Sequence, residues 1–230
     1  ERGVDCLIVS DPSNMGWLTC YDGWSFYVHQ AVIVTSDGEP LWWGRPMDSA
    51  GVAATSWLSP DSVHTYPDNY VMNPEKHPYS HLADLLKSKG WDKKRIGIEL
   101  ENYYFSAACM DTLRAELPNA HFVDATSLVN WQRLVKSDAE LGYIRNAARI
   151  VEAMHQRIRD KIEPGMRKTD LVAEIYDASL RGVEGIGGDY PAIVPLLPSG
   201  KDAAAAHLTW NEKPFQRGEC TFFEIAGVYR

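Results

Sequence analysis

The chain has 230 residues and a formal net charge of −8, with 45% hydrophobic and 23% charged residues. This length suits one large domain or two modest ones, and the composition is that of a soluble globular protein. The acidic balance offers no basic stripe for nucleic acid. No apolar run approaches the roughly 20 residues that a membrane helix needs. We therefore expect neither a nucleic acid nor a membrane as partner.

Four cysteines are present, and none belongs to a C-x-x-C pair; they are Cys6, Cys20, Cys109 and Cys220. A chain of this length does not need a disulfide framework, so we expect reduced thiols and a cytoplasmic protein. The sequence opens at Glu1 almost directly into a strand pattern and stops at Arg230 inside another. We interpret it as a fragment of a longer protein.

Strand and helix patterns alternate through the first 130 residues or so. Short segments rich in β-branched and aromatic residues predict strands at 4–10, 26–35, 40–44, 95–100 and 121–126. The S-D-G-E sequence at 36–39 predicts a hairpin turn, and D-P-S-N at 11–14 predicts another turn. Helical patterns cover 47–58, 79–90 and 105–117. This alternation predicts an α/β unit.

The pattern then changes to long helices. Residues 136–165 form one amphipathic stretch, which opens with an S-x-x-E capping box of Ser137 and Glu140. A second helix is predicted from about 169 to 180, followed by glycine- and proline-rich loops and a final strand at 220–227. We place the domain boundary near 131–137, which gives domains of 1–133 and 134–230.

Two other motifs carry little weight. The glycine-rich segments at 185–190 and 198–201 lack the spacing of a dinucleotide or phosphate loop. His77 and His81 are four residues apart, but no cysteine or glutamate stands near them at a spacing typical of zinc ligands. His77 also precedes Pro78, which favours a position outside the helix. We interpret both histidines as surface residues and predict no metal site.

Two titratable residues of the second part are candidate catalytic groups. His207 follows four alanines on what we expect to be a strand-like piece, so its surroundings should be small and open to a ligand. A histidine in a partly apolar pocket can act as acid or base near neutral pH, and a structural role is the alternative. Glu224 lies in T-F-F-E-I-A-G, and strand alternation places it on one face with Phe222. An outward position or a salt bridge is the alternative for Glu224. We favour a site residue, because burying an unpaired carboxylate is costly.

The segment Y-D-G-W-S-F-Y-V-H-Q at 21–30 holds five aromatic or imidazole rings within nine residues. A core strand has no need of so many rings with polar edges. The pattern indicates a function for this segment, although the residues alone do not name it.

Several motifs resemble the creatinase, prolidase and aminopeptidase P family. The opening K-S-D-A-E-L-G-Y-I-R at 136–145 and the P-G-M turn at 164–166 resemble its catalytic-domain signature. The segment at 191–210 resembles the one that ends in the family's substrate-facing histidine, which carries that role to His207. The segment at 217–227 resembles the strand that bears the first metal-binding aspartate of the peptidases, and Glu224 stands at that position.

The resemblance implies a creatinase-like α/β N-terminal domain followed by the first half of an α+β "pita-bread" catalytic domain. Glutamate in place of aspartate at 224 implies a metal-free branch such as creatinase. The segments at 14–34, 67–78 and 197–214 are similar to those of hydrolases that open a cyclic amidine. We therefore expect a small zwitterionic substrate, no cofactor and a homodimer. The family's further site residues lie beyond Arg230, so we expect the isolated chain to be inactive.

Roles for the candidate residues follow from that resemblance. Glu224 would be the nucleophile or the base that activates water, and His207 would shuttle the proton. In family dimers one N-terminal domain leans over the partner's site, which suggests that Trp24, Tyr27 and His29, together with Tyr21, bind the cationic substrate. An interface cluster without ligand contact is the alternative. Other functions are a divalent-metal Xaa-Pro peptidase and a catalytically inactive binding module.

Overall fold

The computed structural model describes residues 3–230. The chain divides into two units, Glu1–Val135 and Lys136–Arg230, and each is described by itself. None of the helices in the described residues is long and apolar enough to cross a bilayer.

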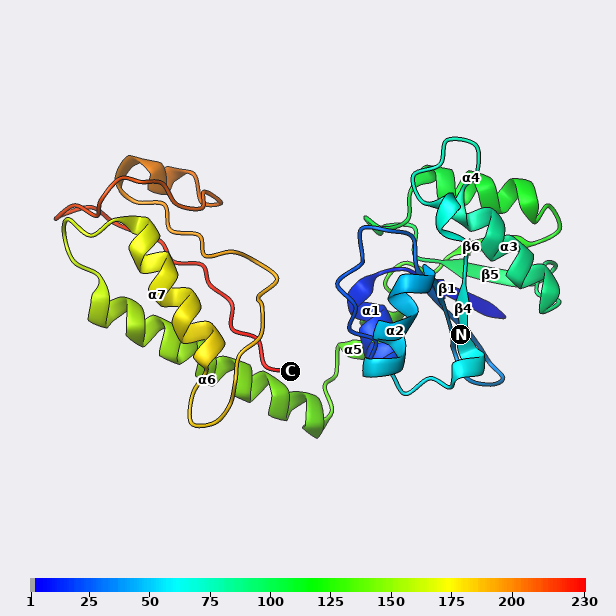
Figure 1. The fold of residues 1–230 in the computed structure, drawn as a ribbon, viewed down its shortest axis with the longest axis horizontal. Helices are drawn as coiled ribbons and strands as arrows, with labels where there is room; N and C mark the ends of the chain where they lie inside the picture. The colour runs from blue at the N-terminus through cyan, green and yellow to red at the C-terminus, as the bar shows by residue number, and fades with distance from the viewer. Residues whose placement is uncertain (1–2) are drawn as a thin grey trace. The chain divides into compact units, whose positions relative to one another are not determined.

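The first unit is built on a six-stranded sheet (Figure 1) with the order β4-β3-β2-β1-β5-β6. Strand β2 runs antiparallel to both β1 and β3, and the other neighbours are parallel. The β2–β3 pairing confirms the predicted hairpin at 36–39. The strands are β1 (Cys6–Val9), β2 (Ala31–Thr35), β3 (Leu41–Gly44), β4 (Val63–Thr65), β5 (Arg95–Ile98) and β6 (His121–Asp124).

Side-chain alternation along β1 divides the core of this unit into two layers. Cys6 and Ile8 pack into the layer beneath α3 and α4, whereas Leu7 and Val9 pack into the layer beneath α1, α2 and α5. Each face of the sheet is therefore covered by helices, as expected of an α/β unit. The helices are α1 (Pro12–Thr19), α2 (Pro46–Thr55), α3 (Pro78–Ser88), α4 (Ala107–Glu116) and α5 (Leu128–Arg133).

Two local predictions in this unit are wrong or incomplete, and two short elements were missed. The supposed turn at 11–14 is the start of α1, because the Asp11 side chain accepts a hydrogen bond from the Asn14 N–H at 2.9 Å and Pro12 stands at the first helical position. The strand predicted at 26–35 begins only at Ala31. Strand β4 and helix α5 were not predicted, because three and six residues are too few to show a period.

A buried carboxylate, Glu99, joins the elements that meet at the end of β5. One of its oxygens accepts hydrogen bonds from the backbone N–H groups of Ser10 and Asp11, at 3.0 Å each, and the other accepts from Asn14 Nδ2 at 2.6 Å. Asn102 Nδ2 donates a fourth hydrogen bond at 3.3 Å. Burial raises the pKa of Glu99, and the donated hydrogen bonds oppose that rise by stabilising the carboxylate.

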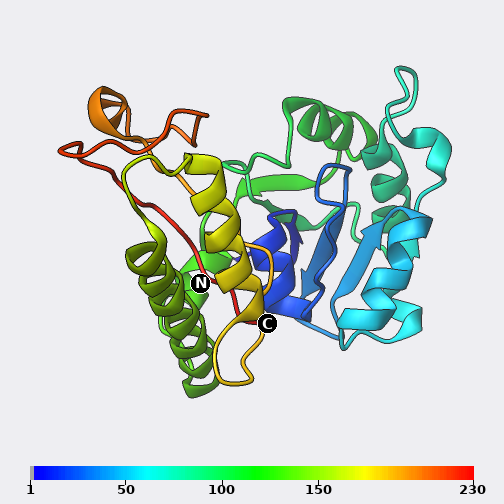
Figure 2. The same ribbon diagram turned by 60° about the vertical axis from the view of Figure 1, so that its left-hand side comes forward.

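The second unit consists of two packed helices and the loops that cover them. Helices α6 (Asp138–Lys161) and α7 (Lys168–Arg181) lie side by side (Figure 2) and bury Ile150, Met154 and Ile175 between them. The predicted capping box at the start of α6 is confirmed. The chain's last segment runs along α6, where a side chain at Gly227 would meet Val151 at 2.9 Å.

The strand predicted at 220–227 is not a regular strand. Residues 196–200 pair with 220–224 in an antiparallel ladder, but only isolated bridges at Leu196↔Glu224 and Ser199↔Thr221 are formed. The Phe222 N–H donates to the Pro198 carbonyl at 3.2 Å. Proline has no N–H, so it cannot donate the return hydrogen bond to Phe222. The ladder therefore loses a hydrogen bond at its centre.

We expect Glu99→Ala to lower the free energy of unfolding of the first unit by about 2–4 kcal/mol, because buried backbone donors lose their acceptor. Tryptophan fluorescence during urea unfolding measures this, since every tryptophan except Trp210 lies in this unit. The exposed Glu101 is the matched control, and Glu101→Ala should stay within about 0.5 kcal/mol of wild type. Equal effects of the two substitutions would contradict the role given to Glu99.

Candidate functional site

The segment 196–200 is hydrogen-bonded to the two stretches of chain that carry the candidate catalytic residues His207 and Glu224. On one side, Leu196 exchanges two hydrogen bonds of 3.0 Å with Glu224. On the other side, the Leu197 N–H donates to the carbonyl of Thr209, also at 3.0 Å, two residues after His207. Leu197 itself is fully buried in the core of the unit. Glu224 and Thr209, which follows His207 by two residues, are therefore hydrogen-bonded to neighbouring residues of one segment.

His207 lies in an exposed turn, not on the strand-like piece that the sequence predicts. The alanines before it belong partly to a short 3₁₀ helix at Gly200–Ala204. Alanine has little preference for extended structure, which explains the difference. His207 is not among the residues that line the pocket beside this turn.

Glu224 occupies the outward, exposed position that the sequence analysis gave as an alternative, so the argument from the cost of burying its carboxylate does not apply. The predicted alternation around it is confirmed. Phe223 and Ile225 pack against the core formed by α6 and α7, whereas Phe222 and Glu224 point away from it and are exposed. Phe222 keeps 56% of its surface accessible. The carboxylate thus stands beside a large exposed aromatic ring on the open face of the ladder.

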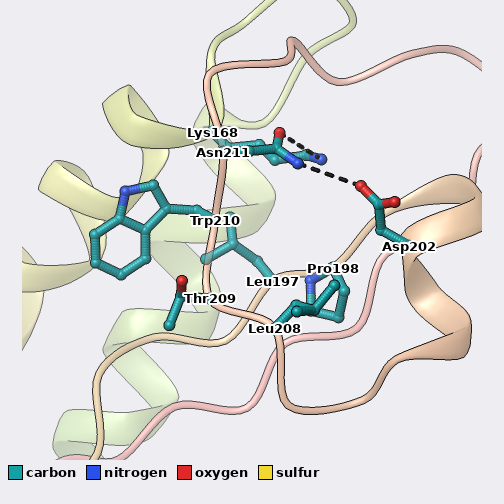
Figure 3. A pocket seen from close by; sticks show the side chains of 8 residues that line it. All are labelled: Lys168, Leu197, Pro198, Asp202, Leu208, Thr209, Trp210 and Asn211. Carbon is teal, nitrogen blue, oxygen red and sulfur yellow. Dashed lines mark hydrogen bonds between the residues drawn. The ribbon is translucent and has the colours of Figure 1, made fainter.

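A small pocket of about 180 Å³ lies next to the His207 turn (Figure 3). Lys168 is only 2% exposed, and its Nζ has a long hydrogen bond of 3.4 Å to Asn211 Oδ1. Asn211 in turn donates to Asp202 Oδ2 at 3.2 Å. The sequence analysis missed this lysine. Its position as the first residue of α7, where the helix dipole disfavours a cation, was the available signal.

The ring-rich segment 21–30, here called the aromatic loop, separates into interior and exterior residues. Tyr21 is in the interior at 4% exposure, with its ring edge against Trp42 and its hydroxyl donating to Gln30 Oε1 at 3.0 Å. The structure therefore gives Tyr21 a packing role and leaves no open face for a ligand. Burial raises its pKa, so the phenol stays neutral.

Trp24 and Tyr27 are the exposed rings of the aromatic loop, at 63% and 64%. Both have edge-to-face contacts with Phe26, which in turn touches Tyr104. The Arg45 guanidinium lies 5.6 Å from the centre of the Tyr27 ring. This cluster already holds one cation at a ring face, which is the interaction that the sequence analysis invoked for a cationic substrate.

His29 is half-buried and faces the interior of the first unit. Its ring lies 4.9 Å from that of His77 and makes an edge contact with Tyr79. Tyr66 donates its hydroxyl hydrogen to the His29 carbonyl at 2.8 Å, which fixes the end of the aromatic loop. Burial, followed by the charge of His77, lowers the pKa of His29 to about 4, so the ring is neutral at pH 7.

Two protein families match this chain and together cover nearly all of it. Residues 1–135 match the creatinase/prolidase N-terminal domain. Residues 142–230 match metallopeptidase family M24. The chain belongs to the creatinase/prolidase family. The predicted combination of an α/β N-terminal domain with a partial pita-bread domain is confirmed.

Ectoine hydrolase from Halomonas elongata is 56% identical over 236 residues, which cover all of this chain and 59% of that protein. The segments at 14–34, 67–78 and 197–214 had indicated that same group of enzymes, and the resemblance is confirmed. The uncharacterized hydrolase/peptidase y4tM of Sinorhizobium fredii is 36% identical, covering 98% of this chain and 58% of that protein. The chain therefore spans less than two thirds of the length of these relatives.

A solved prolidase from Thermococcus sibiricus superposes with a TM-score of 0.78 at 16% identity, over 99% of this chain and 58% of that one. A dipeptidase from Pyrococcus horikoshii gives a TM-score of 0.74 at 20% identity, over 99% and 58%. At these identities the likeness establishes the fold and nothing about the substrate.

The name of the second family raises the question of a metal in the second unit. Among residues 3–230, the group of three or more side chains suited to hold an ion lies in the first unit. Glu224 stands with an aromatic neighbour, and no histidine, cysteine or acid joins it in such a group. We derive no step through a metal.

We expect Tyr21→Phe to destabilise the first unit by about 1–2 kcal/mol, because the buried Gln30 carbonyl loses its hydrogen-bond donor. Tyr27→Phe removes an exposed hydroxyl from the same loop and should change stability by less than about 0.5 kcal/mol. Urea midpoints of the two variants compare them directly. A larger loss for Tyr27→Phe would contradict the division of the loop into interior and exterior rings.

Proposed function

We propose that the whole protein hydrolyses the ring of ectoine to N-acetyl-diaminobutyrate without a metal ion. The supporting observation is the 56% identity to ectoine hydrolase, which extends through both units of this chain. The glutamate at 224, where the family's peptidases are expected to carry a metal-binding aspartate, supports the metal-free part of the proposal. The cytoplasmic location inferred from the cysteines remains a prediction.

The chemistry requires attack on the carbon that lies between the two ring nitrogens of the amidine. One water molecule is added, one carbon–nitrogen bond breaks, and the departing nitrogen takes up a proton. Glu224 either removes a proton from the attacking water or attacks the carbon itself and is released by water in a second step. His207 delivers the proton to the departing nitrogen. A carboxylate also pairs favourably with the amidinium charge.

The exposed position of Glu224 agrees with this role if the rest of the catalytic domain closes over it. Phe222 is an apolar neighbour of Glu224. The backbone N–H and the carbonyl of Glu224 are both hydrogen-bonded to Leu196. The residue is therefore fixed in position by the backbone and has its side chain free of the core.

The aromatic loop is proposed to complete the substrate site of a second subunit in a homodimer. Trp24 and Tyr27 are exposed and form a ring cluster that suits a flat cation, at about 0.5–2 kcal/mol per ring face. His29 lies at the base of the loop and supports it from the interior. Tyr21 supports the same loop through Gln30.

The second candidate function is a metal-dependent Xaa-Pro peptidase. Its support is the match of residues 142–230 to a metallopeptidase family. A catalytically inactive binding module is the third. Both differ from the proposal in what the whole protein does to ectoine, so one substrate assay separates them.

We expect Glu224→Gln and His207→Asn in the whole protein each to reduce the rate of ectoine ring opening by at least about 100-fold, because each removes an acid–base or nucleophilic group. Proton NMR follows the reaction. Glu212→Gln and His155→Gln are the matched controls in the same unit and should keep full activity. Wild-type rates for both Glu224→Gln and His207→Asn would overturn the assignment.

A mixed-dimer experiment tests whether the aromatic loop acts across subunits. Subunits carrying Trp24→Ala are combined in equal amounts with subunits carrying Glu224→Gln. Each mixed dimer then has one intact site, so random pairing should restore about a quarter of wild-type activity from two nearly inactive parents. If the loop serves its own subunit, mixing restores nothing. Full activity of Trp24→Ala alone would show that the ring makes no contact with substrate.

A further inference from the structure

Three residues far apart in the sequence meet in the interior of the first unit. The ligand atoms of His29, His77 and Cys109 all lie within 4.8 Å of one another, and Cys109 Sγ is 3.8 Å from His29 Nδ1. His29 ends the aromatic loop, His77 precedes α3, and Cys109 lies in the first turn of α4. The cluster therefore joins three separate elements of the unit.

The surrounding structure holds each side chain in place. The Tyr79 N–H donates to His77 Nδ1 at 3.2 Å, which caps α3 and leaves Nε2 as the nitrogen that His77 can offer. Cys109 is fully buried, with Ser106 Oγ 3.3 Å from its sulfur. The carbonyl of His29 is fixed by Tyr66. All three groups are thus positioned before any ligand arrives.

The protonation states suit a ligand set. Burial lowers the pKa of His77 as well as that of His29, so both imidazoles are neutral near pH 7 and have a free lone pair. Burial raises the pKa of the Cys109 thiol, which is therefore protonated without an ion. A bound dication would displace that proton to solvent, with one zinc–sulfur bond formed for one S–H bond broken.

We propose that His29, His77 and Cys109 form a binding site for a zinc-class divalent cation. Two imidazoles and a thiolate are the ligands that Zn²⁺ prefers, at about 2.0–2.1 Å to nitrogen and 2.3 Å to sulfur. The ligand atoms, which lie within 4.8 Å of one another, would have to approach one another to reach those distances around one ion. The three ligands leave the fourth tetrahedral position to water or an external group. None of its three ligands is a residue to which we give a step of the hydrolysis.

The ion would tie the base of the aromatic loop to α3 and α4. Trp24 and Tyr27, the exposed rings of this loop, precede His29 in the chain. A bound cation would thus hold these rings in one arrangement without touching them. The sequence analysis missed the site because its ligands are 48 and 32 residues apart, a spacing that no zinc motif has.

The test is a Co²⁺ and Zn²⁺ titration of the 230-residue chain after treatment with chelator and reductant. We expect one equivalent of Co²⁺ to produce a thiolate-to-metal charge-transfer band and the strong visible absorption of four-coordinate cobalt, both displaced by Zn²⁺. Competition with a chromophoric chelator gives the affinity. Cys109→Ser should abolish the charge-transfer band, and His77→Gln should weaken binding by more than about 100-fold, since even indirect partners of a ligand contribute 10–100-fold.

Controls separate a built site from adventitious binding. Cys220→Ser and His121→Gln remove an exposed thiol and an exposed imidazole and should leave the titration unchanged. Zinc should raise the melting temperature of wild type but not that of Cys109→Ser, and circular dichroism verifies that each variant is folded. Retention of the charge-transfer band in folded Cys109→Ser, its loss in Cys220→Ser, or no stoichiometric binding by wild type would each overturn the proposal.

Discussion

The four hydrogen bonds donated to Glu99 join the elements of the first unit at one point. Its oxygens accept hydrogen bonds from the backbone N–H groups of Ser10 and Asp11, which follow β1, and from the side chain of Asn14 in α1. Asn14 continues the connection to α5 through Asn130 and Arg133. Because β1 is central in the sheet, fixing its end also fixes the antiparallel β2–β3 hairpin and the aromatic loop that enters β2. The aromatic loop that carries Trp24, Tyr27 and His29 leads into β2, which pairs with β1.

Much of this architecture is visible in the sequence because it follows from local patterns. The hairpin at 36–39, the capping box of Ser137 and the period of α6 each need only a few adjacent residues. The elements that were predicted wrongly depend on residues outside the segment, or on residue types that occur in two kinds of structure. The start of α1 looks like a turn because aspartate and proline serve both structures. The broken ladder at 220–224 depends on Pro198, which lies in another segment and has no N–H to donate.

In the candidate site, too, some features follow from the local sequence and others from tertiary contacts. The alternation around Glu224 is a local property, and the structure confirms which neighbours pack inward. Whether its face is open or covered depends on partners outside the ladder, and the sequence alone gave the wrong surroundings for His207. The sequence does not distinguish the buried rings of the aromatic loop from the exposed ones, yet Tyr21 is in the core while Tyr27 is exposed. The histidine–cysteine cluster and the buried Lys168 both arise from tertiary contacts, which no spacing rule describes.

The central claim is that the whole protein opens an amidine ring without a metal. The most direct measurement treats the whole protein with a strong chelator, removes the chelated metal, and then follows ectoine by proton NMR, with an Xaa-Pro dipeptide assayed in parallel. The account predicts that ring opening survives the chelator and that the dipeptide is not cleaved. Absence of ring opening, together with dipeptide cleavage that the chelator abolishes, would contradict it and identify a metallopeptidase.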